Sequence, residues 1–153
     1  MPDLLVNLLK LPAVEDLSSQ EFNVRRAQPF ELTPVRRFIA DNFSLSWADE
    51  MSVGFAHQPI SVYVATIEHE LVGFAAYECT RRGFFGPTGV VTAARGKGIG
   101  KVLLLASLRA LHEMGYVYAI IGAAGPVRFY QKTVGAIIIP DSEPGIYTDI
   151  LKT

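Results

Sequence analysis

Glycines and basic side chains are concentrated in the segment RGKGIGK, residues 95–101. Its glycines are Gly96, Gly98 and Gly100, and its basic residues are Arg95, Lys97 and Lys101. The segment follows a β-branched run ending at Val91 and precedes an apolar stretch, which indicates a strand, a turn and a helix. Glycine lets the backbone approach a ligand closely, and amide N–H groups at a helix start bind anions. The sequence therefore predicts an anion site suited to a diphosphate.

Two familiar phosphate-binding loops do not fit this segment. A Walker loop requires Ser or Thr after its Gly-Lys pair, whereas Lys101 is followed by Val102. A dinucleotide fingerprint would need glycine where Leu103 stands. ATP or GTP hydrolysis and dinucleotide binding are therefore not expected.

Length and composition favour one compact domain, residues 1–153, in which residues 1–20 form an N-terminal strand or arm. The chain has 153 residues, half of them hydrophobic, which is enough for a single core. Residues 1–14 are apolar but lack a basic flank and a cleavage pattern, and they are too short to span a bilayer. We therefore expect cytoplasmic localisation and no membrane partner.

Charge and cysteine content exclude other classes of partner. The formal net charge is −1, so no broad basic surface for nucleic acid is expected. Cys79 is the only cysteine, which excludes an internal disulfide, and no Cys/His cluster indicates a metal site.

Periodicity along the chain predicts alternating strands and helices. Strands are expected at 21–27, in a hairpin over 60–80 that turns at 68–70, and at 83–91, 116–124, 137–140 and 145–151. Helices are expected at 29–43, 44–56 with Ser44 or Ser46 as N-cap, 99–114 and 125–136. The order predicts an α/β chain (α+β, with a mixed sheet) of six to seven mostly antiparallel strands and about four helices. One right-handed β-α-β crossover makes a parallel pair.

The segment RGKGIG also matches a known signature. It resembles the acetyl-coenzyme A motif Arg/Gln-x-x-Gly-x-Gly/Ala of the GNAT-superfamily N-acetyltransferases, and the element order is similar to the fold of that superfamily. The resemblance extends from about Glu21 to the final strand and is strongest over residues 83–135, and the stretch 83–116 also resembles a group of bacterial members. It implies a direct transfer of the acetyl group from acetyl-CoA to a primary amine.

The resemblance also implies roles for individual residues. In that family the parallel strands splay apart and the pantetheine arm lies between them. The resemblance therefore implies that the strand at Val90 and Val91 offers main-chain groups to this arm, and that an N–H near Val91 stabilises the carbonyl oxygen of the acetyl group. The implied cofactor contacts are Val90, Val91, Arg95, Gly96, Lys97, Gly98, Ile99, Gly100, Lys101 and Phe129. Tyr130 resembles the family tyrosine that protonates the leaving thiolate, although one extra residue separates it from Gly135. Packing beneath the last strands is the alternative role for Tyr130.

The base that deprotonates the amine is not indicated by one motif. Glu78, Glu50 and His57 are candidates, with Glu78 preferred because it precedes the strand of the site. Trp47 and Glu50 are assigned to the acceptor pocket, although a lone tryptophan also fills cores. The acceptor stays open between a small amine, an amino acid or amino sugar, and a peptide terminus.

Two further alternatives remain at this level. The chain could be an acyl-CoA sensor that keeps the anion site without catalysis. A homodimer could form if a second copy covered an apolar edge made by residues 137–140 and 145–151.

Overall fold

A seven-stranded mixed sheet organises the computed structural model, which describes residues 1–13 and 21–152. Its spatial order is β2-β3-β4-β5-β6-β1-β7, and every neighbouring pair is antiparallel except β5–β6. The strands are β1 (Leu4–Asn7), β2 (Asn23–Arg26), β3 (Val62–Ile67), β4 (Glu70–Tyr77), β5 (Phe84–Val90), β6 (Tyr118–Ile121) and β7 (Ile137–Ile138). The expected mixed sheet with one parallel pair is confirmed.

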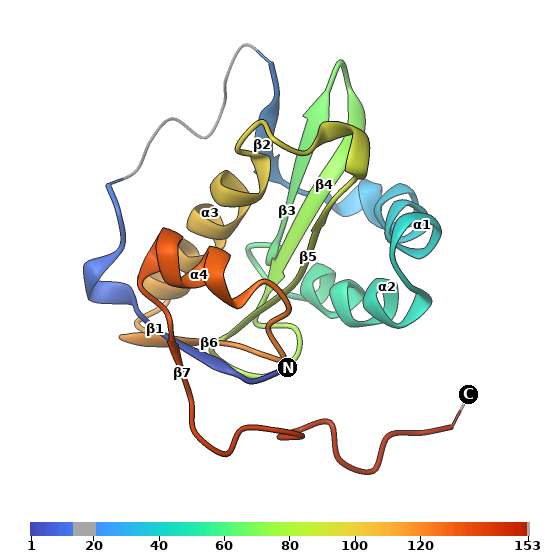
Figure 1. Cartoon of the computed structure of the whole chain (residues 1–153). Coiled ribbons are helices and arrows are strands. Elements are labelled where there is room, and N and C mark those ends of the chain that lie inside the picture. Colours follow the sequence, from blue (N-terminus) through green and yellow to red (C-terminus); the bar gives the residue numbers. More distant parts are fainter. Residues whose placement is uncertain (14–20, 153) are drawn as a thin grey trace.

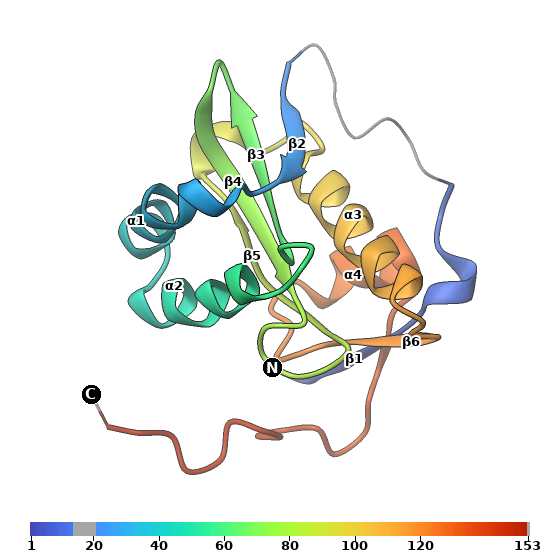
Figure 2. The same ribbon diagram turned by 180° about the vertical axis from the view of Figure 1, so that it is seen from behind.

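Helices cover both faces of this sheet (Figures 1 and 2). The α-helices are α1 (Leu32–Asn42), α2 (Leu45–Ser52), α3 (Ile99–Glu113) and α4 (Val127–Val134). The short 3-10 turns are η1 (Leu8–Lys10), η2 (Pro29–Glu31), η3 (Val53–Ala56) and η4 (Thr92–Ala94). Helices α1 and α2 lie on one face, and α3 and α4 lie on the other. Each face has its own hydrophobic cluster, so the sheet is buried on both sides.

Local sequence explains where several helices begin and end. Ser44 caps α2, because its hydroxyl accepts a hydrogen bond from the Trp47 N–H at 3.1 Å. Gly135 ends α4 with a φ of +65°, a conformation in which glycine carries no Cβ penalty. The cap at Ser44 agrees with one of the two predicted positions.

Strands β5 and β6 pair over only two residues. Phe84 lies beside Ile120 and Phe85 beside Ile121, and β5 then continues without β6 as a partner. On its other side β5 stays paired with β4, with an irregularity where β4 advances from Ala75 to Tyr77. Gly86 and Pro87 of β5 lie opposite this irregularity, between the paired residues Phe85 and Thr88. The sheet is therefore open between β5 and β6 beyond Phe85.

The chain ends differ from the expected closing strands. Strand β1 pairs with β6 on one side and with β7 on the other, so the N-terminal segment lies inside the sheet. The predicted strand at residues 145–151 is wrong, because only β7 forms after α4. Asp141, Gly145 and Asp149 have φ values of +55°, +59° and +57°, which break an extended path. The segment instead passes the β1 and β6 end of the sheet as an irregular chain (Figure 1).

Two consequences of the termini are relevant to partners. Ile137 and Ile138 of β7 are exposed at the sheet edge, and residues 145–151 add no strand beside them. Across residues 1–13 and 21–152, no helix has the length and apolar character needed to cross a membrane.

Candidate functional site

The glycine turn before α3 exposes its backbone. Gly98 is the N-cap of α3 with φ +84°, and Gly96 has φ +85°. No atom lies within 4 Å of a Cβ built at either position. Gly100, within the first turn of α3, has the Val90 side chain as its nearest neighbour at 3.9 Å. The start of α3 is thus uncovered, which suits an anion at its N–H groups.

The three basic residues of the turn differ in their surroundings. Lys97 forms an ion pair with Glu21, which lies just before β2. Arg95 donates from Nε to the Val90 carbonyl at 3.3 Å. Lys101 has no hydrogen bond or ion pair within the described part of the chain, so its ammonium group is available to a ligand.

A cavity of about 460 Å³, here called the glycine-turn pocket, joins this turn to the opening beside β5. It lies on the face of the sheet covered by α3 and α4. Residues from β5, the turn, α3 and α4 line it: Phe85, Thr88, Gly89, Val90, Ala94, Arg95, Gly96, Gly98, Ile99, Gly100, Lys101, Leu104, Pro126, Phe129 and Tyr130. Most residues expected to contact a cofactor are therefore brought together, but Lys97 and Val91 are outside this lining.

Tyr130 lines the glycine-turn pocket from α4. It is 5% exposed, packs edge-on against Phe85, and has a pKa that burial raises to about 12. Its hydroxyl makes no hydrogen bond to the described residues. Among these residues, every fully buried side-chain N or O atom has a hydrogen-bond partner. The Tyr130 hydroxyl has none, so it is not fully buried and keeps some accessible surface. The extra residue before Gly135 thus does not turn Tyr130 away from the pocket.

The main-chain N–H groups of β5 divide between its two sides. Val91 donates its N–H to the Val72 carbonyl at 2.9 Å, so this group is used by the sheet. Successive N–H groups of a strand point in opposite directions. The N–H of Val90 therefore faces the opening, which makes Val90 the better-placed main-chain donor.

A second cavity, of about 430 Å³, lies on the α2 face and is called here the Trp47 pocket. Its lining residues are Met1, Trp47, Glu50, Thr80, Phe85, Gly86, Pro87, Gly122, Ala123, Glu143, Pro144 and Tyr147. Phe85 lines both cavities, so they adjoin at the point where β5 and β6 separate. The structure thus places Trp47 and Glu50, the predicted acceptor residues, in one pocket.

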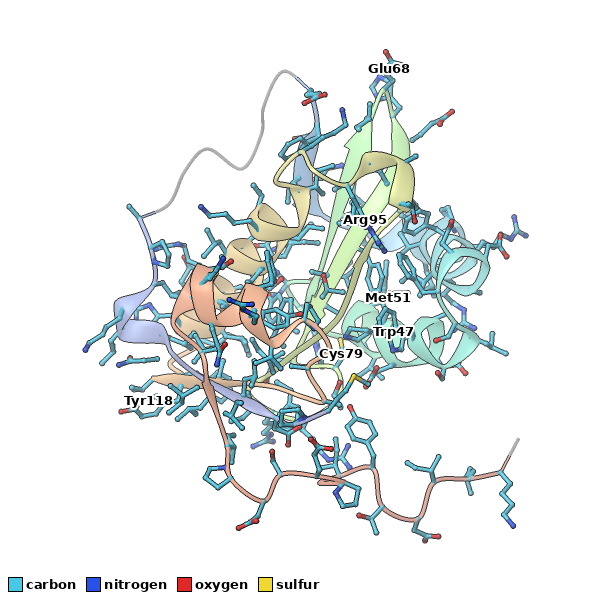
Figure 3. The ribbon with its side chains drawn as sticks, viewed as in Figure 1. Trp47, Met51, Glu68, Cys79, Arg95 and Tyr118 are labelled. Atoms are coloured by element: carbon cyan, nitrogen blue, oxygen red, sulfur yellow. The ribbon has the colours of Figure 1, made fainter. Side chains whose placement is uncertain are left out.

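Glu50 is half-buried in the Trp47 pocket. The Thr80 hydroxyl donates to its Oε2 at 2.6 Å, while its Oε1 has no partner among the described residues. Trp47 points from α2 towards the sheet (Figure 3) and packs against Phe43 and Phe74 at centroid distances of 5.7 and 6.3 Å. These contacts fix the indole, which remains 37% exposed.

The other two candidate bases lie elsewhere. Glu78 accepts hydrogen bonds from the Gly83 N–H and from the Tyr116 hydroxyl, so one oxygen holds the turn between β4 and β5 and the other binds the segment before β6. His57 is 2.8 Å from the Ser61 hydroxyl. Glu78 and His57 both line a separate cavity beside the end of α3, and neither lines the glycine-turn pocket or the Trp47 pocket.

Phe85 and Tyr147 are among the pocket residues that sequence reasoning did not identify. Phe85 stood in a predicted strand with no feature that distinguished it, and Tyr147 stood in a predicted strand that does not form. Burial raises the pKa of Tyr147, and the charges of Glu50 and Asp3 raise it further. No local pattern could have paired Tyr147 with Glu50, because the two are nearly a hundred positions apart.

Cys79 and potential metal ligands do not contribute to these pockets. Cys79 is buried, and desolvation raises the pKa of its thiol to about 11. In residues 1–13 and 21–152, no group of three or more His, Cys, Asp or Glu side chains could hold a metal ion.

Comparisons with known proteins agree with this geometry. The model of an acetyltransferase (GNAT) domain matches residues 58–133, from before β3 into α4. No curated protein matches the chain.

Solved structures share the fold at low sequence identity. A GCN5-related N-acetyltransferase from Sphaerobacter thermophilus matches with a TM-score of 0.72 at 17% identity, over 90% of this chain and 48% of that one. A glucosamine N-acetyltransferase region of a fungal multi-domain GH3 β-N-acetylglucosaminidase also reaches 0.72, at 16% identity, over 90% of this chain and 19% of that one. A GNAT-family acetyltransferase from Brucella melitensis, solved with acetyl-CoA, reaches 0.57 at 20% identity over 73% and 82%.

This chain therefore spans less than half the length of the first two proteins. Three findings nevertheless lead to one assignment: the matched domain, the glycine turn, and the opening between the parallel strands β5 and β6. The chain belongs to the GNAT superfamily of acetyltransferases.

Proposed function

We propose that the chain is an acetyl-CoA-dependent N-acetyltransferase that acts by direct transfer to a primary amine within a ternary complex. One observation supports this most strongly: two pockets on opposite faces of the sheet adjoin at Phe85. One pocket has an anion-binding turn and a phenol, and the other has a carboxylate with a free oxygen. A thioester and an amine entering from opposite faces would therefore meet in the opening beside β5.

The residues of the glycine-turn pocket fit acetyl-CoA. The Arg95 N–H already donates to the Thr92 carbonyl, so the amides from Gly96 to Gly100 would bind the diphosphate, and the ammonium of Lys101 would add a charge-assisted contact. Bound acetyl-CoA supplies the activated acetyl group as a thioester. The open side of β5, including Val90, offers main-chain groups to the extended arm that carries it.

Each step of the transfer would depend on one of three residues: Glu50, Val90 and Tyr130. Glu50 accepts a proton from the ammonium, directly or through water, so that the neutral amine can attack the thioester carbon. The Val90 N–H donates to the carbonyl oxygen, where negative charge develops as the C–N bond forms. Tyr130 donates a proton to sulfur as the C–S bond breaks. The second amine proton leaves nitrogen as the C–S bond breaks and passes, directly or through water, to the Tyr130 phenolate, and solvent removes the first proton from Glu50, leaving a neutral amide and free CoA.

Glu50 is preferred to Glu78 and His57 as the base because of its position. It lines the pocket that adjoins the glycine-turn pocket, and one carboxylate oxygen is unoccupied. Both oxygens of Glu78 already accept hydrogen bonds, from the Gly83 N–H and the Tyr116 hydroxyl, and His57 lies at a separate cavity. Loss of either would be expected to act on the fold rather than on proton transfer.

Thiol release from acetyl-CoA over a set of amines tests the proposal. Tyr130→Phe should lower kcat by about 100-fold or more, the range of a general acid, while CoA affinity changes by less than about twofold. Tyr118→Phe is the matched control, because Tyr118 is exposed at the start of β6. Tight CoA binding without turnover of any amine would support the sensor alternative instead.

A further inference from the structure

The Trp47 pocket has a marked charge asymmetry. Among the described residues, no Lys, Arg or His side chain lines it, whereas Glu50 and Glu143 do. Glu143 is paired with the amino group of Met1 at 2.8 Å, so ammonium recognition would depend on Glu50. The nearby Arg81 is not part of the lining and donates to the Thr80 carbonyl. A cation would be favoured here, and a carboxylate or phosphate would be repelled.

The negative charge of Glu50 acts on Tyr147, another residue that lines the pocket. After burial, the Glu50 carboxylate is the largest cause of the raised pKa of Tyr147. Tyr147 belongs to the segment after β7, whereas Glu50 belongs to α2, so two parts of the chain that are distant in sequence contribute these residues to the lining of one cavity. An ammonium group placed beside Glu50 would lie within this negative field.

The remaining walls are mainly apolar. Rings of Trp47, Phe85 and Tyr147 form them, together with Pro87 and Pro144. The side chains able to hydrogen bond in addition to the two carboxylates are those of Trp47, through its indole N–H, Thr80 and Tyr147, and the Thr80 hydroxyl already donates to Glu50. A sugar with many hydroxyls would lose hydrogen bonds to water with few replacements. An aromatic or alkyl body instead gains from burial and ring contacts.

We propose that the acceptor is a small primary amine with an aromatic or alkyl body and without a carboxylate or phosphate, bound with its ammonium at Glu50 and its body between Trp47 and Tyr147. This inference rests on the proposed acetyl transfer. The cavity, about 430 Å³, is within the size range of small-molecule sites. The lining thus selects among the amines, amino acids, amino sugars and peptide termini that the sequence left open.

Four probes separate the features of the acceptor. Phenethylamine and phenylalanine share a body and differ by a carboxylate, and phenylalaninamide keeps the added size without the charge. Glucosamine keeps the ammonium on a polar body. With acetyl-CoA, kcat/KM for phenethylamine should exceed that for phenylalanine and for glucosamine by about 30-fold or more, with phenylalaninamide between. Equal or better turnover of phenylalanine or glucosamine would overturn the inference while leaving acetyl transfer intact.

Binding can be measured without turnover, because Trp47 is the only tryptophan in the chain. Adding phenethylamine to the CoA-loaded protein should change the Trp47 emission saturably, and phenylalanine should not at the same concentration. Glu50→Gln should weaken this binding about tenfold or more and reduce the preference over phenylalanine. Glu70→Gln is the matched control, because Glu70 is exposed at the start of β4.

The two readouts separate the two proposals. A saturable Trp47 response without thiol release from any amine would refute acetyl transfer but retain the ligand class. No response to phenethylamine, or an unchanged response in Glu50→Gln, would overturn the ligand class.

Discussion

Gly100→Ala gives the sharpest test of the anion site, because this substitution should separate folding from ligand binding. Gly100 is the second residue of α3, where alanine is a better helix former than glycine. The added Cβ would have only the Val90 side chain nearby, at 3.9 Å, so no clash is introduced. The free energy of unfolding should therefore stay the same or rise by up to about 1 kcal/mol.

CoA affinity should change in the opposite direction. The Cβ would occupy space in the glycine-turn pocket beside the exposed N–H groups. Losing one hydrogen bond from an amide to a charged phosphate costs about 1.5–3 kcal/mol, which corresponds to a Kd weaker by about 10- to 150-fold. Calorimetric titration with CoA and denaturant unfolding of the same preparations measure both quantities.

Gly98→Ala provides the comparison. Gly98 has φ +84°, and no atom lies within 4 Å of its built Cβ, so its cost to folding is conformational, about 1–2 kcal/mol. That variant should lose stability as well as affinity, whereas Gly100→Ala should lose affinity alone. The reasoning would be refuted if Gly100→Ala bound CoA as tightly as the wild type, or if its stability and affinity fell together.

Four further expectations follow from the contacts around the two pockets. Lys101→Ala should weaken CoA binding about tenfold at low salt, whereas Lys97→Ala should change it much less, because Lys97 is already paired with Glu21; equal losses in titrations of the two variants would contradict this difference. Gly89→Ala should lower the free energy of unfolding by about 1–3 kcal/mol, since the added Cβ would lie 2.5 Å from the Phe43 ring, and an unchanged denaturant midpoint would argue against this packing. The Cys79 thiol, with its pKa raised to about 11, should react with a disulfide reagent at pH 8 only as fast as the chain unfolds, and rapid labelling of the folded protein would contradict its burial. The pKa of Tyr130 is raised to about 12, so the folded state holds this proton more tightly than the unfolded state; stability should fall as pH rises from about 10 to 12, and Tyr130→Phe should reduce that fall in denaturant titrations at each pH.

The sequence by itself determined the features that depend on neighbouring residues. Alternating glycines before an apolar helix specify the turn at residues 95–100, because positive φ and close approach are local properties of glycine. Hydrophobic periodicity specified α3 and the β3–β4 hairpin, and a hydroxyl before an apolar run specified the Ser44 cap. These signals also carried the resemblance to the GNAT superfamily.

Only the tertiary structure decided which distant groups meet. Glu78 and Glu50 were both plausible bases by residue type, but the fold commits Glu78 to a turn and leaves an oxygen of Glu50 in a pocket. The ladder between β4 and β5 decided that Val90, not Val91, has its N–H free. The insertion of β1 between β6 and β7, and the position of Tyr147 opposite α2, had no local signal. Strand pairing and pocket formation depend on contacts across the whole chain, and a local pattern does not specify those partners.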